Sequence, residues 1–124
     1  MGTRIKIKAG EVALEAELND SGTAKKVADE MPIEGAVSTW GDEIYFAIPV
    51  DESLDETARE IVEVGDIGYW PAGSAFCIFF GPTPISVAGE VRPASAVNII
   101  GKVNGDPMVL KSVRDGDTIT LQKV

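Results

Sequence analysis

The 124 residues of this chain include no histidine, so any chemistry must depend on other side chains, chiefly carboxylates and aromatic rings. Without histidine, Ser-His and Cys-His nucleophile pairs and imidazole-based zinc sites are excluded. Acidic side chains gather at four places: Asp42 with Glu43, Glu63 with Asp66, residues 51–56, and Asp115 with Asp117. A carboxylate pair can serve as general acid and base or hold a hard cation. No spacing here matches a calcium loop, however, and Gly-Asp pairs are common in turns. We therefore predict solvated turns, with no catalytic residue, no metal and no cofactor.

Cys77 and Ser74 are the remaining candidates for a nucleophile. Cys77 is the only cysteine, which excludes an intrachain disulfide, and it lies in an apolar stretch. We expect a buried, inert thiol there. Ser74 follows a glycine in a predicted turn and has no evident base.

All eight aromatic residues fall between positions 40 and 80: Trp40, Tyr45, Phe46, Tyr69, Trp70, Phe76, Phe79 and Phe80. Because side chains alternate along a strand, Phe79 should share a face with Cys77, while Phe76 takes the other face. One face would fill a core, and the other could line a concave surface near Trp70 and the loop at 81–84. We name Tyr69, Trp70 and Phe79 as candidate ligand contacts, with simple core packing as the alternative.

Arg59 is the fourth candidate for ligand binding. It is the only positive charge between Lys26 and Arg92, so it could bind an anion or neutralise neighbouring carboxylates. A surface ion pair is the simpler interpretation.

The charge balance narrows the classes of partner. A net charge of −9 and a pI near 4.4 disfavour nucleic acid and anionic membranes, and they mildly favour cationic ligands. No signal peptide or membrane-spanning stretch is evident, so we expect a cytoplasmic protein. The length and a hydrophobic content of 44% fit a single domain over residues 1–124, and they leave the oligomeric state open.

The elements that must position these residues are mostly strands. Period-two alternation over residues 4–9 and 12–18 predicts two half-buried strands. A short helix should follow, capped by Thr23 and ended by Pro32, with Ala24, Val27, Ala28 and Met31 on one face.

Further strands are predicted at seven places: residues 35–40, 43–50, 61–64, 67–70, 75–80, 97–103 and 118–124. In the second of these, Ile44 and Phe46 point one way and Glu43 and Tyr45 the other. Asp106 followed by Pro107 predicts the start of a second short helix. The pattern favours a mainly β fold, a closed barrel of about eight strands with one or two short helices.

Two stretches resemble cyclophilins. Residues 73–78 (Gly-Ser-Ala-Phe-Cys-Ile) are similar to their Gly-Ser-x-Phe-Phe-Ile strand, and residues 100–106 are similar to their Phe-Gly-x-Val-x-x-Gly-Met-Asp stretch. Residues 40–46, 64–71 and 76–84 resemble more closely a group of small prokaryotic cyclophilin-like proteins of unknown function. The resemblance covers nearly the whole chain and implies an eight-stranded cyclophilin-type barrel.

The resemblance does not extend to the isomerase residues. Cyclophilins carry an Arg on a strand after the first helix, followed by a Phe and a Gln, but here no Lys or Arg lies between Lys26 and Arg59. The only Gln is Gln122, Cys77 replaces the second Phe of the strand, and the histidine is missing. We therefore predict a module that binds a small molecule or a peptide, without ordinary prolyl isomerase activity. A weak isomerase, a carboxylate-based enzyme using Glu43 or Asp66, and a structural subunit remain as alternatives.

Overall fold

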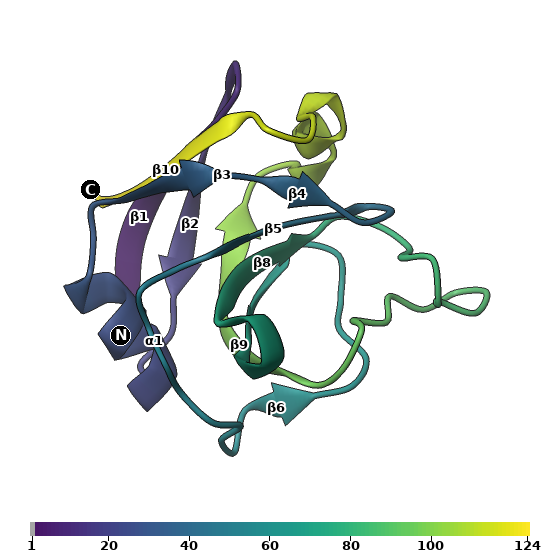
Figure 1. Ribbon diagram of the computed structural model, residues 1–124, viewed down its shortest axis with the longest axis horizontal. Helices are drawn as coiled ribbons and strands as arrows, with labels where there is room; N and C mark the ends of the chain where they lie inside the picture. The colour runs from purple at the N-terminus through teal and green to yellow at the C-terminus, as the bar shows by residue number, and fades with distance from the viewer. Residues whose placement is uncertain (1) are drawn as a thin grey trace.

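Ten antiparallel strands form one strongly curved sheet in the computed structural model, which describes residues 2–124 (Figure 1). The strands are β1 (Thr3–Ala9), β2 (Val12–Leu18), β3 (Ile33–Ala36), β4 (Ser38–Thr39), β5 (Glu43–Ala47), β6 (Ala58–Arg59), β7 (Asp66–Trp70), β8 (Ala75–Phe79), β9 (Val97–Asn104) and β10 (Thr118–Lys123). Three short helical segments accompany them: α1 (Gly22–Asp29) and the 3-10 turns η1 (Pro71–Gly73) and η2 (Pro107–Ser112). The fold is therefore mainly β, as the sequence predicts.

The sheet does not close into a hydrogen-bonded barrel. Its order is β3-β10-β1-β2-β9-β7-β8-β5-β4, with β6 paired to β9 off this path. The prediction of a closed barrel of about eight strands is thus wrong in both strand number and closure. The physical reason lies at Val37, which divides the predicted strand 35–40: its N–H donates to the Asp117 carbonyl, and its own carbonyl accepts from Gly116 N–H. The residues before Val37 pair with β10, and the residues after it pair with β5. The two edges of the sheet are therefore connected by the covalent chain and not by hydrogen bonds between strands.

The N-cap of helix α1 lies two residues before the predicted cap. The side chain of Ser21 accepts a hydrogen bond from Ala24 N–H at 3.2 Å and is the actual N-cap. Thr23, the predicted cap, is buried, and its hydroxyl donates to Asp55 Oδ2 at 2.9 Å. Ala24, Val27 and Ala28 are buried as predicted.

The second predicted helix is confirmed as the 3-10 turn η2. Asp106 caps it by accepting from Met108 N–H at 3.0 Å, and Pro107 opens it. Leu110 is fully buried, so this segment is fixed to the sheet by packing as well as by its cap.

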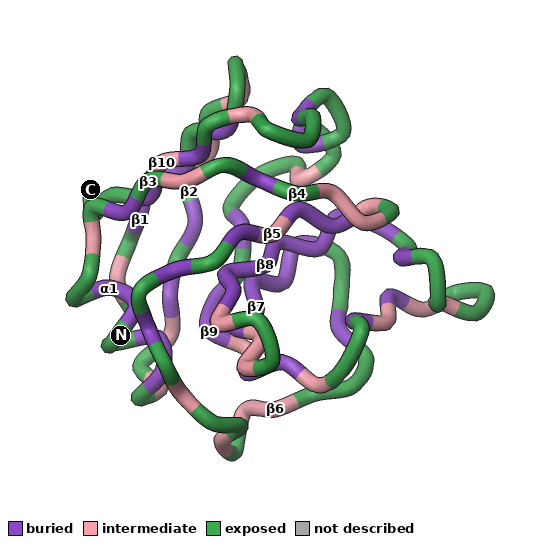
Figure 2. Tube along the Cα trace, viewed as in Figure 1, coloured by how far each residue is buried: buried purple, intermediate pink, exposed green. Residues whose placement is uncertain are grey.

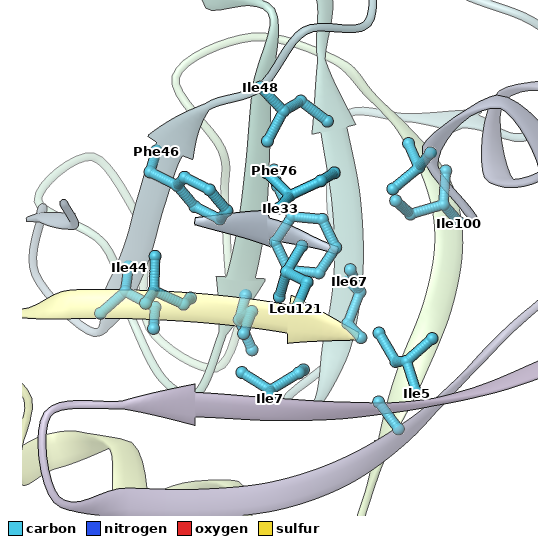
Figure 3. Packing of buried hydrophobic residues seen from close by; sticks show 14 of the residues in the cluster. Ile5, Ile7, Ile33, Ile44, Phe46, Ile48, Ile67, Phe76, Ile100 and Leu121 are labelled. Atoms are coloured by element: carbon cyan, nitrogen blue, oxygen red, sulfur yellow. The ribbon is translucent and has the colours of Figure 1, made fainter. Parts of the chain in front are cut away.

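The inner face of the sheet holds the larger apolar cluster, which we call the inner cluster. Figure 3 shows its side chains converging from strands on opposite sides of the curve. Its members include Ile5, Ile7, Leu18, Ile44, Phe46, Ile67, Tyr69, Phe76, Ile78, Ile100, Ile119 and Leu121. Phe46 and Phe76 pack with ring centroids 5.8 Å apart. This cluster is the core that the alternating strands predict.

A smaller cluster lies on the outer face of β7, β8 and β9, and we call it the outer cluster. It consists of Val62, Ala75, Cys77, Phe79, Val91 and Val97, with Tyr45, Trp70 and Ile99 packed against it. Strand β8 is consequently buried at all five positions, which is why its sequence is continuously apolar rather than alternating. The connection from 81 to 96 covers part of this face and carries exposed and half-buried residues over much of its length (Figure 2).

Candidate functional site

A cavity of about 220 Å³ opens on the outer face, at the edge of the outer cluster. Strands β5, β7 and β9, the residue before the β4–β5 turn and the end of the 81–96 connection build its walls. The lining residues are Trp40, Glu43, Tyr45, Trp70, Pro93, Ala94 and Val97. A single water needs roughly 10–15 Å³ of such space, so the cavity has room for a small organic group.

Three of the seven lining residues, Trp40, Tyr45 and Trp70, are aromatic, and several contacts hold the Trp70 ring. Its ring meets Tyr45 edge-on, with centroids 6.4 Å apart and planes at 80°. Its indole Nε1–H donates to Ser95 Oγ at 2.6 Å. Gly73 lies close to the ring, and a Cβ added there would come within 2.8 Å of it. These contacts restrict the orientation of the Trp70 ring.

Glu43 is the acidic residue of the cavity lining. It is the first residue of β5, lies opposite Phe79 of β8, and is only 6% exposed. Burial in these apolar surroundings raises the pKa of its carboxyl group from 4.5 to about 7, and a hydrogen bond with the Cys77 thiol opposes part of that rise. None of the ion pairs within residues 2–124 includes Glu43. The carboxyl group is therefore buried beside the cavity with no ion-pair partner among residues 2–124.

Cys77 is buried behind this carboxyl group, as its apolar sequence context predicts. Burial, together with the neighbouring Glu43, raises the pKa of the thiol well above 9.0. A thiol that stays protonated is a poor nucleophile, so Cys77 contributes packing and a weak hydrogen-bond donor.

Of the four residues predicted as ligand contacts, Trp70 lines the cavity and the other three lie elsewhere. Tyr69 points into the inner cluster, is fully buried, and donates its hydroxyl hydrogen to the Val50 carbonyl at 2.6 Å. Phe79 is fully buried in the outer cluster and is not among the residues that line the cavity. Arg59 is exposed on β6 and borders a separate hollow that also includes Glu63 and Asp66. The structure thus separates residues that the sequence analysis grouped together.

Sequence reasoning missed Trp40, Glu43 and Tyr45 as cavity residues. A signal was available, because the alternation of β5 puts Glu43 and Tyr45 on the face opposite the core residues Ile44 and Phe46. The same alternation shows that Tyr69 and Trp70, as neighbours in β7, must face opposite ways. Pro93, Ala94 and Val97 gave no such signal, since a loop has no repeating pattern.

The other carboxylate groupings are held by turns and surface lysines. Asp66 accepts a hydrogen bond from Glu63 N–H at 2.8 Å and lies 3.8 Å from Lys102 Nζ. Asp42 lies 3.8 Å from Lys111 Nζ. Within residues 2–124 no group of three or more His, Cys, Asp or Glu side chains is arranged to hold a metal ion. Nor does that part of the chain contain a helix long and apolar enough to cross a membrane.

Comparison with known proteins places the chain in a family. None of the curated proteins matches the sequence. The chain is similar to a hypothetical protein from Archaeoglobus fulgidus, whose structure was determined in solution: the two are 38% identical, and the TM-score is 0.83 over 99% of this chain and 95% of that one. The family described as Cyclophilin-like matches residues 3–122. With a match over nearly its whole length, this chain belongs to the cyclophilin-like family.

Proposed function

We propose that this chain is a binding module that takes a small molecule, or one side chain of a peptide, into the cavity on its outer face. The observation that carries the proposal is the combination of a cavity lined by three aromatic residues and one buried carboxyl group that has no cationic partner among residues 2–124. Apolar pockets with a few convergent polar groups are the usual form of ligand sites. The single predicted domain and a cytoplasmic location are part of the same proposal.

Ordinary prolyl isomerase activity is not part of the proposed function. That reaction uses a cationic donor aimed at the prolyl nitrogen, in keeping with the general importance of preorganised electrostatics in catalysis. The described residues that line the cavity include no Arg or Lys, and an acidic group occupies it instead. A protease-coupled assay on proline peptides should give the uncatalysed rate, and a rate above it that disappears in Glu43→Gln would overturn this part of the proposal.

Glu43 also supports a second candidate function, proton transfer. A carboxyl group with a pKa of about 7 is half protonated at neutral pH, which is the condition in which a general acid or base is most effective. If an activity is found, this hypothesis requires that Glu43→Gln abolish it while the exposed-site variant Glu11→Gln retains it.

The binding proposal can be tested through the tryptophans. The chain has two, Trp40 and Trp70, and both line the cavity, so tryptophan emission reports directly on its occupancy. We expect members of a panel of neutral, anionic and cationic metabolites and short peptides to raise the melting temperature and shift this emission in a saturable way.

A blocked cavity provides the control for that panel. Ala94 lines the cavity at an exposed position, whereas Ala88 is exposed in the same connection and does not line it. Ala94→Phe should abolish the response and Ala88→Phe should keep it. A panel without any stabilising compound, or a response that survives Ala94→Phe, would contradict the proposed site.

A further inference from the structure

The charged and aromatic residues that line the cavity favour a positively charged ligand. Trp40, Tyr45 and Trp70 contribute aromatic rings, whose faces carry partial negative charge and attract cations. Glu43 contributes the formal negative charge, and Pro93, Ala94 and Val97 add apolar surface without any charge. A cation that entered would meet attraction from several sides.

Within the described part of the chain, no basic side chain forms an ion pair with Glu43. Its nearest basic neighbours in sequence are Lys26, which pairs with Glu52, and Arg59, which is exposed on β6. Further along the chain, Lys111 of η2 pairs with Asp42, and Arg92 pairs with Glu90. The polar group that contacts Glu43 is the Cys77 thiol, a weak donor. A buried carboxylate without a cation is energetically unfavourable, and a cationic ligand would relieve that cost.

The residues that line the cavity favour an organic cation over a metal ion. Ca²⁺ takes 6–8 oxygen ligands and Mg²⁺ requires near-octahedral oxygen coordination, whereas the described lining supplies one carboxylate and one phenol. A methylated ammonium instead spreads its charge over methyl groups, which fit against aromatic faces and need no hydrogen bonds. The net charge of −9 also raises the local concentration of any small cation near the surface.

We propose that the cavity is an aromatic cage for a methylated ammonium group, with Trp40, Tyr45 and Trp70 around the cation and Glu43 as its counter-ion. This inference rests on the proposed function, since it names the ligand chemistry of the same cavity. It also explains why Trp70 is fixed by Ser95 and Gly73, because an aromatic cage works best when its rings are oriented before the ligand arrives.

The decisive probes are choline and its neutral isostere 3,3-dimethylbutan-1-ol, which have nearly the same shape and differ in charge. In calorimetric titrations at pH 8, choline should bind at least about tenfold more tightly than the neutral compound. Equal affinities would overturn the ammonium inference and leave the proposed binding function standing. Failure of both to bind would also overturn it, and the broader panel would then decide the proposed function by itself.

Variants assign the preference to named side chains. Glu43→Gln keeps the shape of the residue and should bring the two affinities to within about threefold of each other, whereas Glu11→Gln, an exposed residue remote from the cavity lining, should leave their ratio unchanged. Trp70→Leu keeps apolar volume but removes a π face, and it should weaken choline more than the neutral isostere. If the preference for choline persists in Glu43→Gln, the assigned counter-ion is wrong.

The wild-type protein offers a second test that does not depend on a variant folding. The other titratable groups beside Glu43 are the Cys77 thiol on β8, the Tyr45 phenol on β5, and Asp42 in its ion pair with Lys111. Ionisation of Glu43 should therefore dominate between pH 6 and 8, so choline affinity should rise several-fold across that range while the affinity for the neutral isostere stays flat. Parallel pH profiles for both compounds would contradict the inference.

The same experiment distinguishes two sources of the ammonium group, a free metabolite and a methylated side chain of a peptide. Trimethyllysine within a short peptide carries the same headgroup on a side chain. Tighter binding of the peptide than of choline would support a side-chain ligand, and the reverse would support a free metabolite; either order supports the cage.

Discussion

The two faces of β5 and β8 carry side chains from the same strands and yet have opposite characters. On the inner face, Ile44, Phe46, Phe76 and Ile78 pack into a sealed cluster. On the outer face, Glu43 and Tyr45 border a cavity that is only partly covered by the 81–96 connection. The tightly packed core therefore lies inside the curve of the sheet, whereas the outer face carries an acidic group whose burial is energetically unfavourable.

The polar groups of the two faces differ in the same way. Buried Tyr69, on the inner side, donates to the Val50 carbonyl and accepts from Glu52 N–H at 3.1 Å. Within residues 2–124, the side-chain partner of Glu43, on the outer side, is the thiol of Cys77, which also donates to the Ala75 carbonyl. A satisfied polar group stabilises the fold, whereas one without a strong partner is available to a ligand.

The largest expected effect comes from truncating an aromatic ring on each face. Phe76→Ala removes a fully buried ring from the inner cluster and should lower the free energy of unfolding by about 3–5 kcal/mol. Trp70→Ala removes a half-buried ring and should lower it by about 1 kcal/mol, since solvent already reaches that ring. Urea unfolding measures both values. Equal losses would mean that the outer face is as important to stability as the core, and the comparison would fail.

The next effect concerns the pH dependence of stability. Because the pKa of Glu43 is raised from 4.5 to about 7 on folding, its stabilising contribution is fully present below pH 4.5 and is lost as the pH rises through 7. At about 1.36 kcal/mol for each pH unit between the two pKa values, the loss is on the order of 3 kcal/mol. Glu43→Gln cannot ionise, so it should be more stable than the wild type at pH 8, by an amount that shrinks towards pH 5.

Urea unfolding of both proteins over pH 5–8 checks this. The difference between the two curves isolates Glu43 from the carboxyl groups of Asp55, Glu90 and Asp115, whose pKa values are lowered and whose effects have the opposite sign. Two parallel curves would show that Glu43 is not buried as described.

The sequence predicted the inner face well and the outer face poorly, for a physical reason. Alternation identified the strands and placed Phe76 and Cys77 on opposite faces, because burial on one face leaves a period-two pattern. The cavity depends on which loop folds over which strand, and residues 93–97 approach Tyr45 only in three dimensions. Trp70, a large aromatic residue beside Pro71, lines the cavity, whereas its neighbour Tyr69 faces the inner cluster. The prediction of a closed barrel was wrong at Val37, because the single strand predicted there is two short strands that pair with different neighbours.

The smallest expected effect tests whether the orientation of the Trp70 ring contributes to ligand affinity. Ser95→Ala removes the acceptor for the Trp70 indole N–H and should lower the unfolding free energy by less than about 1 kcal/mol, since Ser95 is exposed. Ligand affinity should fall roughly two- to fivefold, because Trp70 would have to be ordered on binding. Calorimetry on Ser95→Ala, with the exposed Ser112→Ala as control, measures the change. An unchanged affinity would show that the ring needs no hydrogen bond to hold its place.

The most direct test of the account is a nuclear magnetic resonance titration with choline that follows the two indole N–H signals. Both tryptophans line the cavity, whereas Ile5 and Ile78 lie in the inner cluster. We expect the Trp40 and Trp70 indole signals to shift in a saturable way, while the methyl signals of Ile5 and Ile78 stay unchanged. Indole signals that stay fixed while choline binds elsewhere, or that never respond, would contradict it.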